Sequence, residues 1–397
     1  MEKYVVIGNG VAGMSAAENI RDRDRNGKVT IVSDEKYYTY SRLMLSHYLG
    51  SDVQPEKLYI HPVSWYEERS IELMRDTKVI ETDIERKIVK TSKGDLPYTK
   101  LIIASGSHSF IPPVEGTDKK GVFALRNYDD MAAITRAIGS SRKAIVIGGG
   151  VLGLEAAWAI KKAGLDVEVL EFAPRLLPRQ MDEEGSAILK KIIEDAGVTT
   201  YLGVESKSVL GNDRAEGVIL KDGREIKADF VVFSSGVRPN IEFLKDRAIN
   251  VNRGIIIDDH TKTSADDIYA AGDVAEFNGV MPAIWPVAQK QGKIAGMNTA
   301  GEDSVYHAIP PSNMLKVMDV SCFSVGEINN EKGGLKELKY AGDNEYYKLF
   351  LKGNVLVGAM MVGDVSKSTK IKSYIDHGKD ISEFLKTDNV KEIISSL

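Results

Sequence analysis

A three-glycine motif, Gly-x-Gly-x-x-Gly, occurs twice in the chain, and the second copy begins 140 residues after the first. Each copy follows a run of β-branched residues and precedes an alanine-rich segment, at residues 4–17 and 144–157. A second apolar run follows each copy, at 29–32 and 167–170. This order predicts a strand, a tight turn, a helix and a second strand, so the repeat favours two separate βαβ units.

The three glycines have different physical roles in a dinucleotide site. The first allows the tight turn after the strand, the second lets the backbone approach a pyrophosphate, and the third lets the helix pack closely. Unpaired N–H groups at the helix start then bind the anion. One copy alone also occurs for structural reasons, but two copies in the same context favour two nucleotide sites. The expected cradles contain Gly8, Gly10, Val11, Ala12 and Gly13 in the first copy and Gly148, Gly150, Val151, Leu152 and Gly153 in the second.

An acidic residue follows the second strand of each unit, where a carboxylate accepts hydrogen bonds from ribose hydroxyls. Asp34 and Glu35 occupy this place in the first unit, and Glu171 occupies it in the second. A carboxylate repels the 2′-phosphate of NADPH and accepts from the free 2′-hydroxyl of NADH, so Glu171 favours NADH. Arg175 is the one nearby residue that would weaken this preference, although Pro174 before it favours a surface-loop role.

The single cysteine of this 397-residue chain, Cys322, excludes an intramolecular disulfide, a Cys-x-x-Cys centre and a four-thiolate iron–sulfur cluster. Its simplest interpretation is a small buried hydrophobic side chain. The six histidines lack metal-ligand spacing, so we expect no metal site, and electron chemistry requires a bound organic cofactor. A net charge of −5, short apolar runs and no export signal predict a cytoplasmic protein that binds neither nucleic acid nor membrane.

Two further apolar runs end in small or acidic residues. Small residues at a strand end let the backbone approach a ligand, and an aspartate there accepts hydrogen bonds from hydroxyl groups. The simpler alternative for the aspartate is a turn or a helix cap. The residues at the two strand ends are Ala104, Ser105 and Gly106 after the first run and Gly272 and Asp273 after the second.

With these runs included, residues 1–305 resemble the two-dinucleotide flavoprotein family, that of the disulfide reductases and ferredoxin reductases. The resemblance implies that the first glycine motif is the FAD site and that the second is the NAD site. It implies that residues 104–106 are the family's Ala-Thr-Gly turn, with Ser105 in place of Thr. It also implies that Asp273 binds the ribityl chain of FAD.

Further positions take their roles from the resemblance alone. Gly236 begins a Gly-x-x-Pro segment that returns the chain to the FAD domain, and Trp285 stands at the start of a helix that points at the flavin ring. Val79 matches a backbone contact to the FAD adenine, Arg126 an arginine near FAD, and Glu155 a glutamate near flavin N5. The alternatives are an edge-strand core residue, a surface cation and an acid at a helix N-terminus.

Residues 40–48 distinguish branches of the family. Disulfide reductases carry Cys-x-x-x-x-Cys near this place and coenzyme-A disulfide reductases a single cysteine, where this chain has Leu43. Ferredoxin-reductase relatives have Arg-Pro-Pro-Leu-Ser-Lys; Arg42 matches as a cofactor contact, but His47 replaces the lysine. The segment looks most like NADH:rubredoxin oxidoreductases and the flavoprotein module of nitrite reductase large subunits. One cysteine excludes the iron–sulfur and sirohaem parts of a full nitrite reductase.

The expected fold class is α/β, with two Rossmann-like dinucleotide-binding domains and a small α+β C-terminal domain that covers the flavin or forms an interface. In the last domain, Gly353-Asn354 between two apolar runs predicts a β-hairpin, followed by helices at 366–374 and 381–397. A monomer and a homodimer both remain open. The expected boundaries are 1–110 and 239–305 for the discontinuous FAD domain, 111–238 for the NAD domain and 306–397 for the C-terminal domain.

The expected activity is hydride transfer from NADH to FAD, followed by electron transfer to a small carrier protein of the rubredoxin or ferredoxin type. Hydride transfer needs alignment rather than a protein acid or base, and His47 and Glu155 would flank flavin N5. Two alternatives stay open: an NADH oxidase that reduces O₂ to peroxide, and a redox-responsive flavoprotein that acts as a binding module. The acceptor and the strictness of the NADH preference stay open as well.

Overall fold

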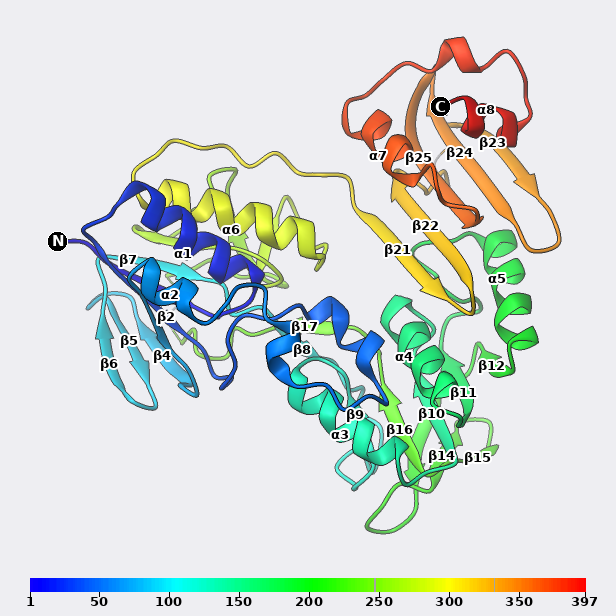
Figure 1. Ribbon diagram of the computed structural model, residues 1–397, viewed down its shortest axis with the longest axis horizontal. Coiled ribbons are helices and arrows are strands. Elements are labelled where there is room, and N and C mark those ends of the chain that lie inside the picture. The colour runs from blue at the N-terminus through cyan, green and yellow to red at the C-terminus, as the bar shows by residue number, and fades with distance from the viewer. Residues whose placement is uncertain (246–247, 332) are drawn as a thin grey trace. The chain divides into compact units, whose positions relative to one another are not determined.

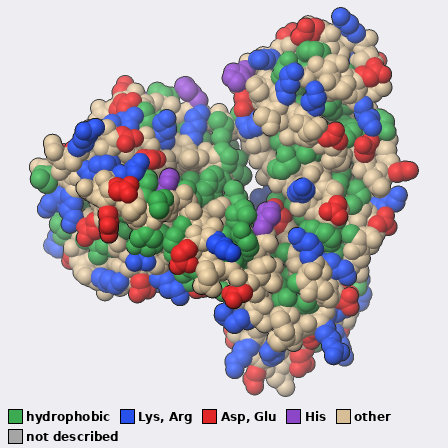
Figure 2. Space-filling model, in the orientation of Figure 1, with side chains coloured by type: hydrophobic (Ala, Val, Ile, Leu, Met, Phe, Trp, Pro, Cys, Tyr) green, Lys and Arg blue, Asp and Glu red, His purple; other side chains and the backbone are tan. Residues whose placement is uncertain are grey.

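The computed structural model describes residues 1–245, 248–331 and 333–397. Acidic and basic side chains are interspersed over the visible face, in keeping with the small net charge of −5 (Figure 2). Within the described residues, no helix has both the length and the apolar character of a bilayer span. The chain forms two compact units: unit 1 consists of Met1–Arg42, Val53–His108 and Val237–Ile309, and unit 2 of Leu43–Asp52, Ser109–Gly236 and Pro310–Leu397.

Unit 1 contains a five-stranded parallel sheet with the strand order β19-β7-β1-β2-β3. Helices α1 (Val11–Arg23) and α6 (Trp285–Thr299) lie side by side (Figure 1). Their apolar side chains join those of the sheet in one buried core. The sheet strands are β1 Lys3–Ile7, β2 Lys28–Val32, β3 Ile71–Met74, β7 Lys100–Ile103 and β19 Ile268–Ala270. The smaller elements are the antiparallel strands β4 Val79–Asp83, β5 Ile88–Thr91 and β6 Gly94–Pro97, the parallel pair β18 Ile255–Ile257 and β20 Ala275–Phe277, the helix α2 Ser64–Glu68 and the turn η3 Pro55–Leu58.

Two glycines bring α1 and α6 into close backbone contact. A Cβ built on Gly292 would lie 2.2 Å from the backbone oxygen of Ala12, and a Cβ on Gly296 would lie 2.3 Å from that of Ala16. Larger residues would therefore force the two helices apart, which close-packed interiors resist. The contact fixes α6 against the helix that belongs to the first glycine motif.

Unit 2 contains a second five-stranded parallel sheet, with the strand order β12-β11-β10-β16-β9. Helix α4 (Val151–Lys162) follows β10 as α1 follows β1, so the repeated sequence forms a repeated structure. The segment Leu43–Asp52, which includes the short turn η2 (Ser46–Tyr48), belongs to this unit. The other elements are β9 Val122–Ala124, β10 Lys143–Ile147, β11 Asp166–Glu171, β12 Val198–Leu202, β16 Phe230–Phe233, α3 Tyr128–Ile138, α5 Glu183–Asp195 and the antiparallel strands β13 Ser206–Leu210, β14 Gly217–Leu220 and β15 Glu225–Lys227.

The C-terminal part of unit 2 is a five-stranded antiparallel sheet with the order β21-β22-β25-β24-β23 and two helices. The predicted hairpin is confirmed, because β24 and β25 join at Gly353-Asn354. The predicted helix at 381–397 is wrong in its first half, since Asn389 caps a helix that starts only at Val390. The predicted fold class is confirmed. The elements are β21 Ser312–Val317, β22 Val320–Gly326, β23 Lys336–Ala341, β24 Tyr346–Lys352, β25 Val355–Gly363, α7 Ser368–Asp376, the turn η4 Ser382–Phe384 and α8 Val390–Ser396.

Candidate functional site

The first glycine motif forms a tight backbone cradle between β1 and α1. A Cβ on Gly8 would lie 2.2 Å from the carbonyl oxygen of Ala104, and one on Gly13 would lie 1.9 Å from that of Gly8. A Cβ on Gly10 would meet nothing within 4 Å, and no side chain caps the helix. The space in front of the first N–H groups of α1, including those of Val11 and Ala12, is therefore open and fits a pyrophosphate.

The second motif repeats this geometry between β10 and α4. A Cβ on Gly148 would lie 2.3 Å from the carbonyl oxygen of Ser234, and one on Gly153 would lie 2.0 Å from that of Gly148. A Cβ on Gly150 would again meet nothing within 4 Å, and α4 has no side-chain cap. The second helix start, with Val151 and Leu152 in its first turn, fits a second pyrophosphate for the same reason.

Glu171 lies at the end of β11, directly beside the second cradle. Its carboxylate accepts hydrogen bonds from the backbone N–H groups of Gly149, between the first two glycines of the motif, and of Ala173, the latter at 2.7 Å. The side chain is half-buried. A fixed carboxylate, an acceptor of the kind that ribose hydroxyls need, thus lies beside the second cradle.

Arg175 is tied into its own loop. Its Nε donates to the carbonyl oxygen of Met181 at 3.2 Å, and its terminal nitrogen donates to that of Pro178 at 3.2 Å. These bonds support the loop interpretation of this arginine over a role in binding a 2′-phosphate.

In the first unit the two candidate acids differ. Asp34 is exposed, whereas Glu35 accepts a hydrogen bond from the Tyr40 hydroxyl at 2.6 Å and forms an ion pair with Arg42. Burial alone would lower the pKa of Arg42, but the Tyr40 phenol, the Glu35 carboxylate and the Asp273 carboxylate outweigh it and raise the pKa. Arg42 therefore stays charged and lies within electrostatic reach of both Glu35 and Asp273.

Asp273 follows the end of β19 and accepts a hydrogen bond from the Ser107 hydroxyl at 2.8 Å. Gly272 before it has a φ of +85° and donates its N–H to the Gln291 side chain at 2.9 Å. Because Gln291 lies on α6, which starts at Trp285, this bond connects the strand end to the helix that the resemblance places at the flavin. Ser107 and Gln291 are site candidates that sequence reasoning missed.

The end of β7 is held by a reciprocal pair of hydrogen bonds. The Ser105 hydroxyl donates to the carbonyl oxygen of Asn240 at 2.7 Å, and the Asn240 side chain donates to that of Ser105 at 2.8 Å. Ala104 is buried, and Gly106 adopts a φ of +67°. The Ser105 hydroxyl therefore joins the end of β7 to Asn240, a partner that its distant sequence position concealed.

A third group that the sequence did not reveal supports the first cradle. The Asn9 side chain, between the first two glycines, accepts a hydrogen bond from the Thr39 hydroxyl at 2.7 Å and from the Tyr66 hydroxyl at 3.1 Å. The two hydroxyl groups are 2.6 Å apart. These hydrogen bonds fix the conformation of the loop between β1 and α1. The asparagine between two glycines is the one sign of them in the sequence.

Glu155 on α4 has Ser46 rather than His47 as its hydrogen-bond partner. The Ser46 hydroxyl donates to the Glu155 carboxylate at 2.8 Å, whereas His47 is exposed and its Nδ1 lies 3.2 Å from the carbonyl oxygen of Leu43. Burial raises the pKa of Glu155, and the Ser46 hydrogen bond and the His47 charge only partly oppose this. The carboxyl is therefore biased toward holding a proton.

The raised pKa of Glu155 predicts a pH-dependent stability. An unperturbed glutamate titrates near 4.5, so between that value and the raised one the folded protein binds more protons than the unfolded chain. The free energy of unfolding then falls as pH rises through this window. We expect Glu155→Gln to remove the fall, so that the variant melts higher than the wild type above the window and shows a smaller advantage below it.

Scanning calorimetry between about pH 4 and about pH 8 measures the effect. The exposed residue Glu225, changed to glutamine, serves as a control and should keep the wild-type profile. Parallel melting curves for wild type and Glu155→Gln at all pH values would contradict the prediction.

Three other residues that the resemblance predicts as cofactor contacts lie far from one another in the sequence. Val79 is half-buried at the start of β4, where it pairs with Thr91. In unit 2, the N–H of half-buried Arg126 donates to the Asp130 carboxylate at 2.9 Å. Gly236 has a φ of +98°. Their cofactor roles stay predictions.

Cys322 is buried on β22, and this burial raises the pKa of its thiol to about 12. It is the small buried side chain that the sequence predicts. Among the described residues, one cluster has metal-type ligands: the exposed Asp258 and Asp259 and the half-buried His260 place ligand atoms within 4.8 Å of one another. Exposed acidic groups of this kind are common without an ion, and His260 also pairs with Asp303.

The comparisons with known proteins assign the family. Residues 2–292 match the pyridine nucleotide-disulphide oxidoreductase family, and residues 311–379 match the rubredoxin NAD⁺ reductase C-terminal domain. The chain belongs to the pyridine nucleotide-disulphide oxidoreductase family. Members are FAD-containing, NAD(P)H-dependent oxidoreductases, and the C-terminal match indicates the rubredoxin reductase type. The resemblance and enzyme class predicted from the motifs are thereby confirmed.

Three curated relatives show the range of the similarity. The chain is 38% identical to a nitrite reductase [NAD(P)H] of Bacillus subtilis, with 96% of this chain but 48% of that protein covered. It is 34% identical to the NADH-rubredoxin oxidoreductase of Clostridium acetobutylicum over 98% of both chains, and the crystal structure of that protein superposes with a TM-score of 0.82 and full coverage of both. It is 31% identical to an NADH oxidase of Methanocaldococcus jannaschii, with 82% and 76% covered. The chain thus spans about half of the nitrite reductase and nearly all of the rubredoxin oxidoreductase.

Proposed function

We propose that this chain is an FAD-dependent oxidoreductase that takes hydride from NADH and passes the electrons to a small carrier protein such as rubredoxin. The observation that carries the proposal is the pair of open glycine cradles, each with a carboxylate at or shortly after the end of the next strand. The near full-length match to an NADH-rubredoxin oxidoreductase supports the same activity. Bound FAD supplies the chemistry that couples two-electron oxidation of NADH to one-electron reduction of a carrier.

Unit 1 is proposed to hold FAD. The open cradle at Gly10 binds the pyrophosphate, Glu35 accepts from ribose hydroxyls, and Asp273 accepts from the ribityl chain. Arg42 forms an ion pair with Glu35 and lies within electrostatic reach of Asp273, so its charge offsets part of the charge of the two carboxylates. The hydrogen bonds of Ser107 to Asp273 and of Thr39 to Asn9 orient these groups before the cofactor binds.

Unit 2 is proposed to hold NADH. The cradle at Gly150 binds its pyrophosphate, and the Glu171 carboxylate accepts from the adenosine ribose. A 2′-phosphate would meet this carboxylate, and the Arg175 guanidinium already donates to two carbonyl oxygens of its own loop. NADH is therefore the favoured donor. The resemblance assigns Glu155 and His47 to the N5 edge of the flavin, and burial, which raises the pKa of Glu155, suits a hydrogen-bonding role there.

Electrons leave without a thiol relay, because the only cysteine, Cys322, is buried with a strongly raised thiol pKa. A one-electron carrier protein then fits as the acceptor. The similarity to an NADH oxidase favours molecular oxygen as a second candidate, with hydrogen peroxide as the product. The two acceptors are separated by the rate at which each reoxidises the reduced enzyme.

The test is stopped-flow kinetics on the purified, FAD-loaded protein. NADH should bleach the flavin absorption band, and oxidised rubredoxin should then restore it much faster than air-saturated buffer. Reoxidation by air at the same rate with or without rubredoxin would support the oxidase instead. Slow reoxidation by both, together with an NADH-driven change in oligomeric state, would indicate the binding module. A band that NADH leaves unbleached would overturn the reductase and the oxidase alike.

A further inference from the structure

The segment between Glu171 and Asp182 connects the second cradle to helix α5. At its cradle end, the Leu177 N–H donates to the carbonyl oxygen of Gly149 at 2.9 Å, beside the Glu171 carboxylate that binds the Gly149 N–H. Leu177 adopts a φ of +47°, a conformation that is unusual for a leucine and requires support from its surroundings. We name this segment, residues 172–181, the ribose loop.

The far end of the ribose loop is fixed by the C-terminal sheet. Asp182, which caps α5, accepts hydrogen bonds from the Tyr346 hydroxyl at 2.5 Å and from Lys348 Nζ at 3.0 Å, both on β24. Tyr346 is fully buried, and the Lys348 side chain is 13% exposed and also pairs with Glu337 at 2.9 Å. A Cβ on Gly185 would lie 2.8 Å from the Tyr346 ring, so the ring packs directly against α5.

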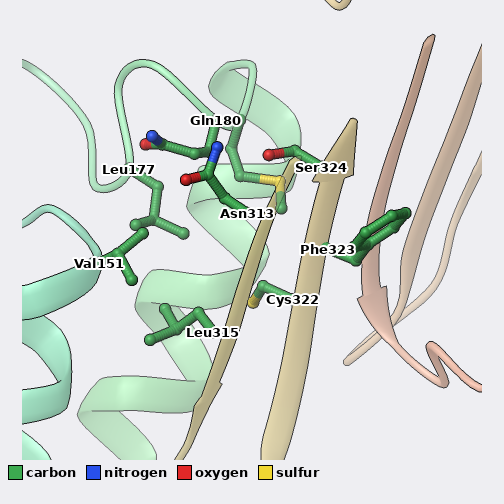
Figure 3. A pocket seen from close by; sticks show the side chains of 9 residues that line it. Val151, Leu177, Gln180, Asn313, Leu315, Cys322, Phe323 and Ser324 are labelled. Atoms are coloured by element: carbon green, nitrogen blue, oxygen red, sulfur yellow. The ribbon is translucent and has the colours of Figure 1, made fainter. Parts of the chain in front are cut away.

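Side chains of the ribose loop also face the first two strands of that sheet. Leu177 and Gln180 line a narrow space opposite Leu315 on β21 and Cys322 on β22, as Figure 3 shows. The loop therefore faces the C-terminal sheet along its length, and Asp182 directly after it is hydrogen-bonded to that sheet. In the described residues, no strand pairing holds the loop itself.

We propose that Tyr346 and Lys348 are positioning residues for NADH: through Asp182 they hold the ribose loop, and hence Glu171 and the second cradle, in the binding conformation. The inference rests on the proposed function and assigns a role to the C-terminal sheet in nucleotide binding. A loop that is fixed before binding loses less conformational entropy when the ligand arrives. Loosening the far end should therefore weaken binding of the nucleotide without touching the hydride-transfer geometry.

The experiment compares Tyr346→Phe, Lys348→Met and the double variant with a matched control. Lys339→Met removes the exposed ion pair with Glu184, which also joins the C-terminal sheet to α5 but leaves Asp182 untouched. We expect the double variant to raise the KM for NADH and the Kd for ADP-ribose by the same factor, roughly five- to twentyfold. Flavin content should stay unchanged, and kcat and all values of the control should stay within about twofold.

ADP-ribose binding separates this inference from the proposed function. If wild-type protein failed to bind ADP-ribose or its flavin were not reduced by NADH, the proposed function and this inference with it would be wrong. If wild type behaved as proposed while the variants lost melting temperature but kept the ADP-ribose Kd, the inference alone would be overturned. If the double variant fails to fold, the same KM and Kd are measured with Tyr346→Phe, which removes only a hydroxyl group.

Discussion

Replacing Glu171 by alanine is expected to raise the KM for NADH by ~10- to 100-fold and to shift the NADPH-to-NADH preference toward NADPH. Hydrogen bonds from ribose hydroxyls to a carboxylate are charge-assisted, and their loss leaves the hydroxyls of a bound NADH without that acceptor. The carboxylate also accepts from Gly149 and Ala173, so its removal loosens the cradle in addition. Loss of the negative charge removes the repulsion of a 2′-phosphate.

Steady-state kinetics with both nucleotides and a saturating acceptor measure the change. Asp166→Ala is the matched control, because Asp166 is an exposed acid at the opposite end of the same strand, 81% exposed and paired only loosely with Lys161 at 3.7 Å. The control should leave both KM values within about twofold. An unchanged NADPH-to-NADH ratio in Glu171→Ala would place the ribose acceptor elsewhere.

The cradles were predictable because their requirements are local. Gly8 and Gly148 each leave room for a neighbouring carbonyl oxygen, while Gly10 and Gly150 face open space, and each feature falls at one position of a short motif. The repeat then located both helices and both following strands. Local backbone geometry is the information that a sequence motif carries most directly.

The side chains that hold the site come from distant parts of the chain and have no such motif. Ser107 meets Asp273 across 166 positions, Ser46 meets Glu155 across 109, and Tyr346 meets Asp182 across 164. Each pair forms only because separate strands and helices converge. Serine and tyrosine hydroxyls are also common on surfaces, so their types alone gave no signal.

Two hairpins of the C-terminal sheet differ in whether the sequence could predict them. Gly353-Asn354 predicted the turn between β24 and β25, and Gly353 adopts the positive φ, +62°, that such a tight hairpin needs. The turn between β21 and β22 uses Met318 and Asp319, with φ values of +46° and +56°. A methionine there carries no turn signal, so this hairpin was not anticipated.

Replacing Asp273 by alanine is expected to yield protein that purifies with little or no FAD. The variant loses the proposed acceptor for the ribityl hydroxyls, and it leaves the Ser107 hydroxyl without its acceptor. It also removes one of the two carboxylates that raise the pKa of Arg42, so the positive charge of Arg42 loses part of its compensation. We expect FAD to bind at least ~10-fold more weakly, which is the loss of one charge-assisted hydrogen bond.

The ratio of flavin to protein absorbance after purification, followed by titration with FAD, measures this loss. Asp266→Ala is the control, because Asp266 is 95% exposed and lies outside the strand that leads to Asp273. Asp273→Asn keeps an oxygen acceptor but no charge, so it should retain more FAD than alanine and less than wild type. Full flavin retention by Asp273→Ala would show that the ribityl chain is held by other groups, and that Asp273 serves chiefly as the partner of Ser107 and Arg42.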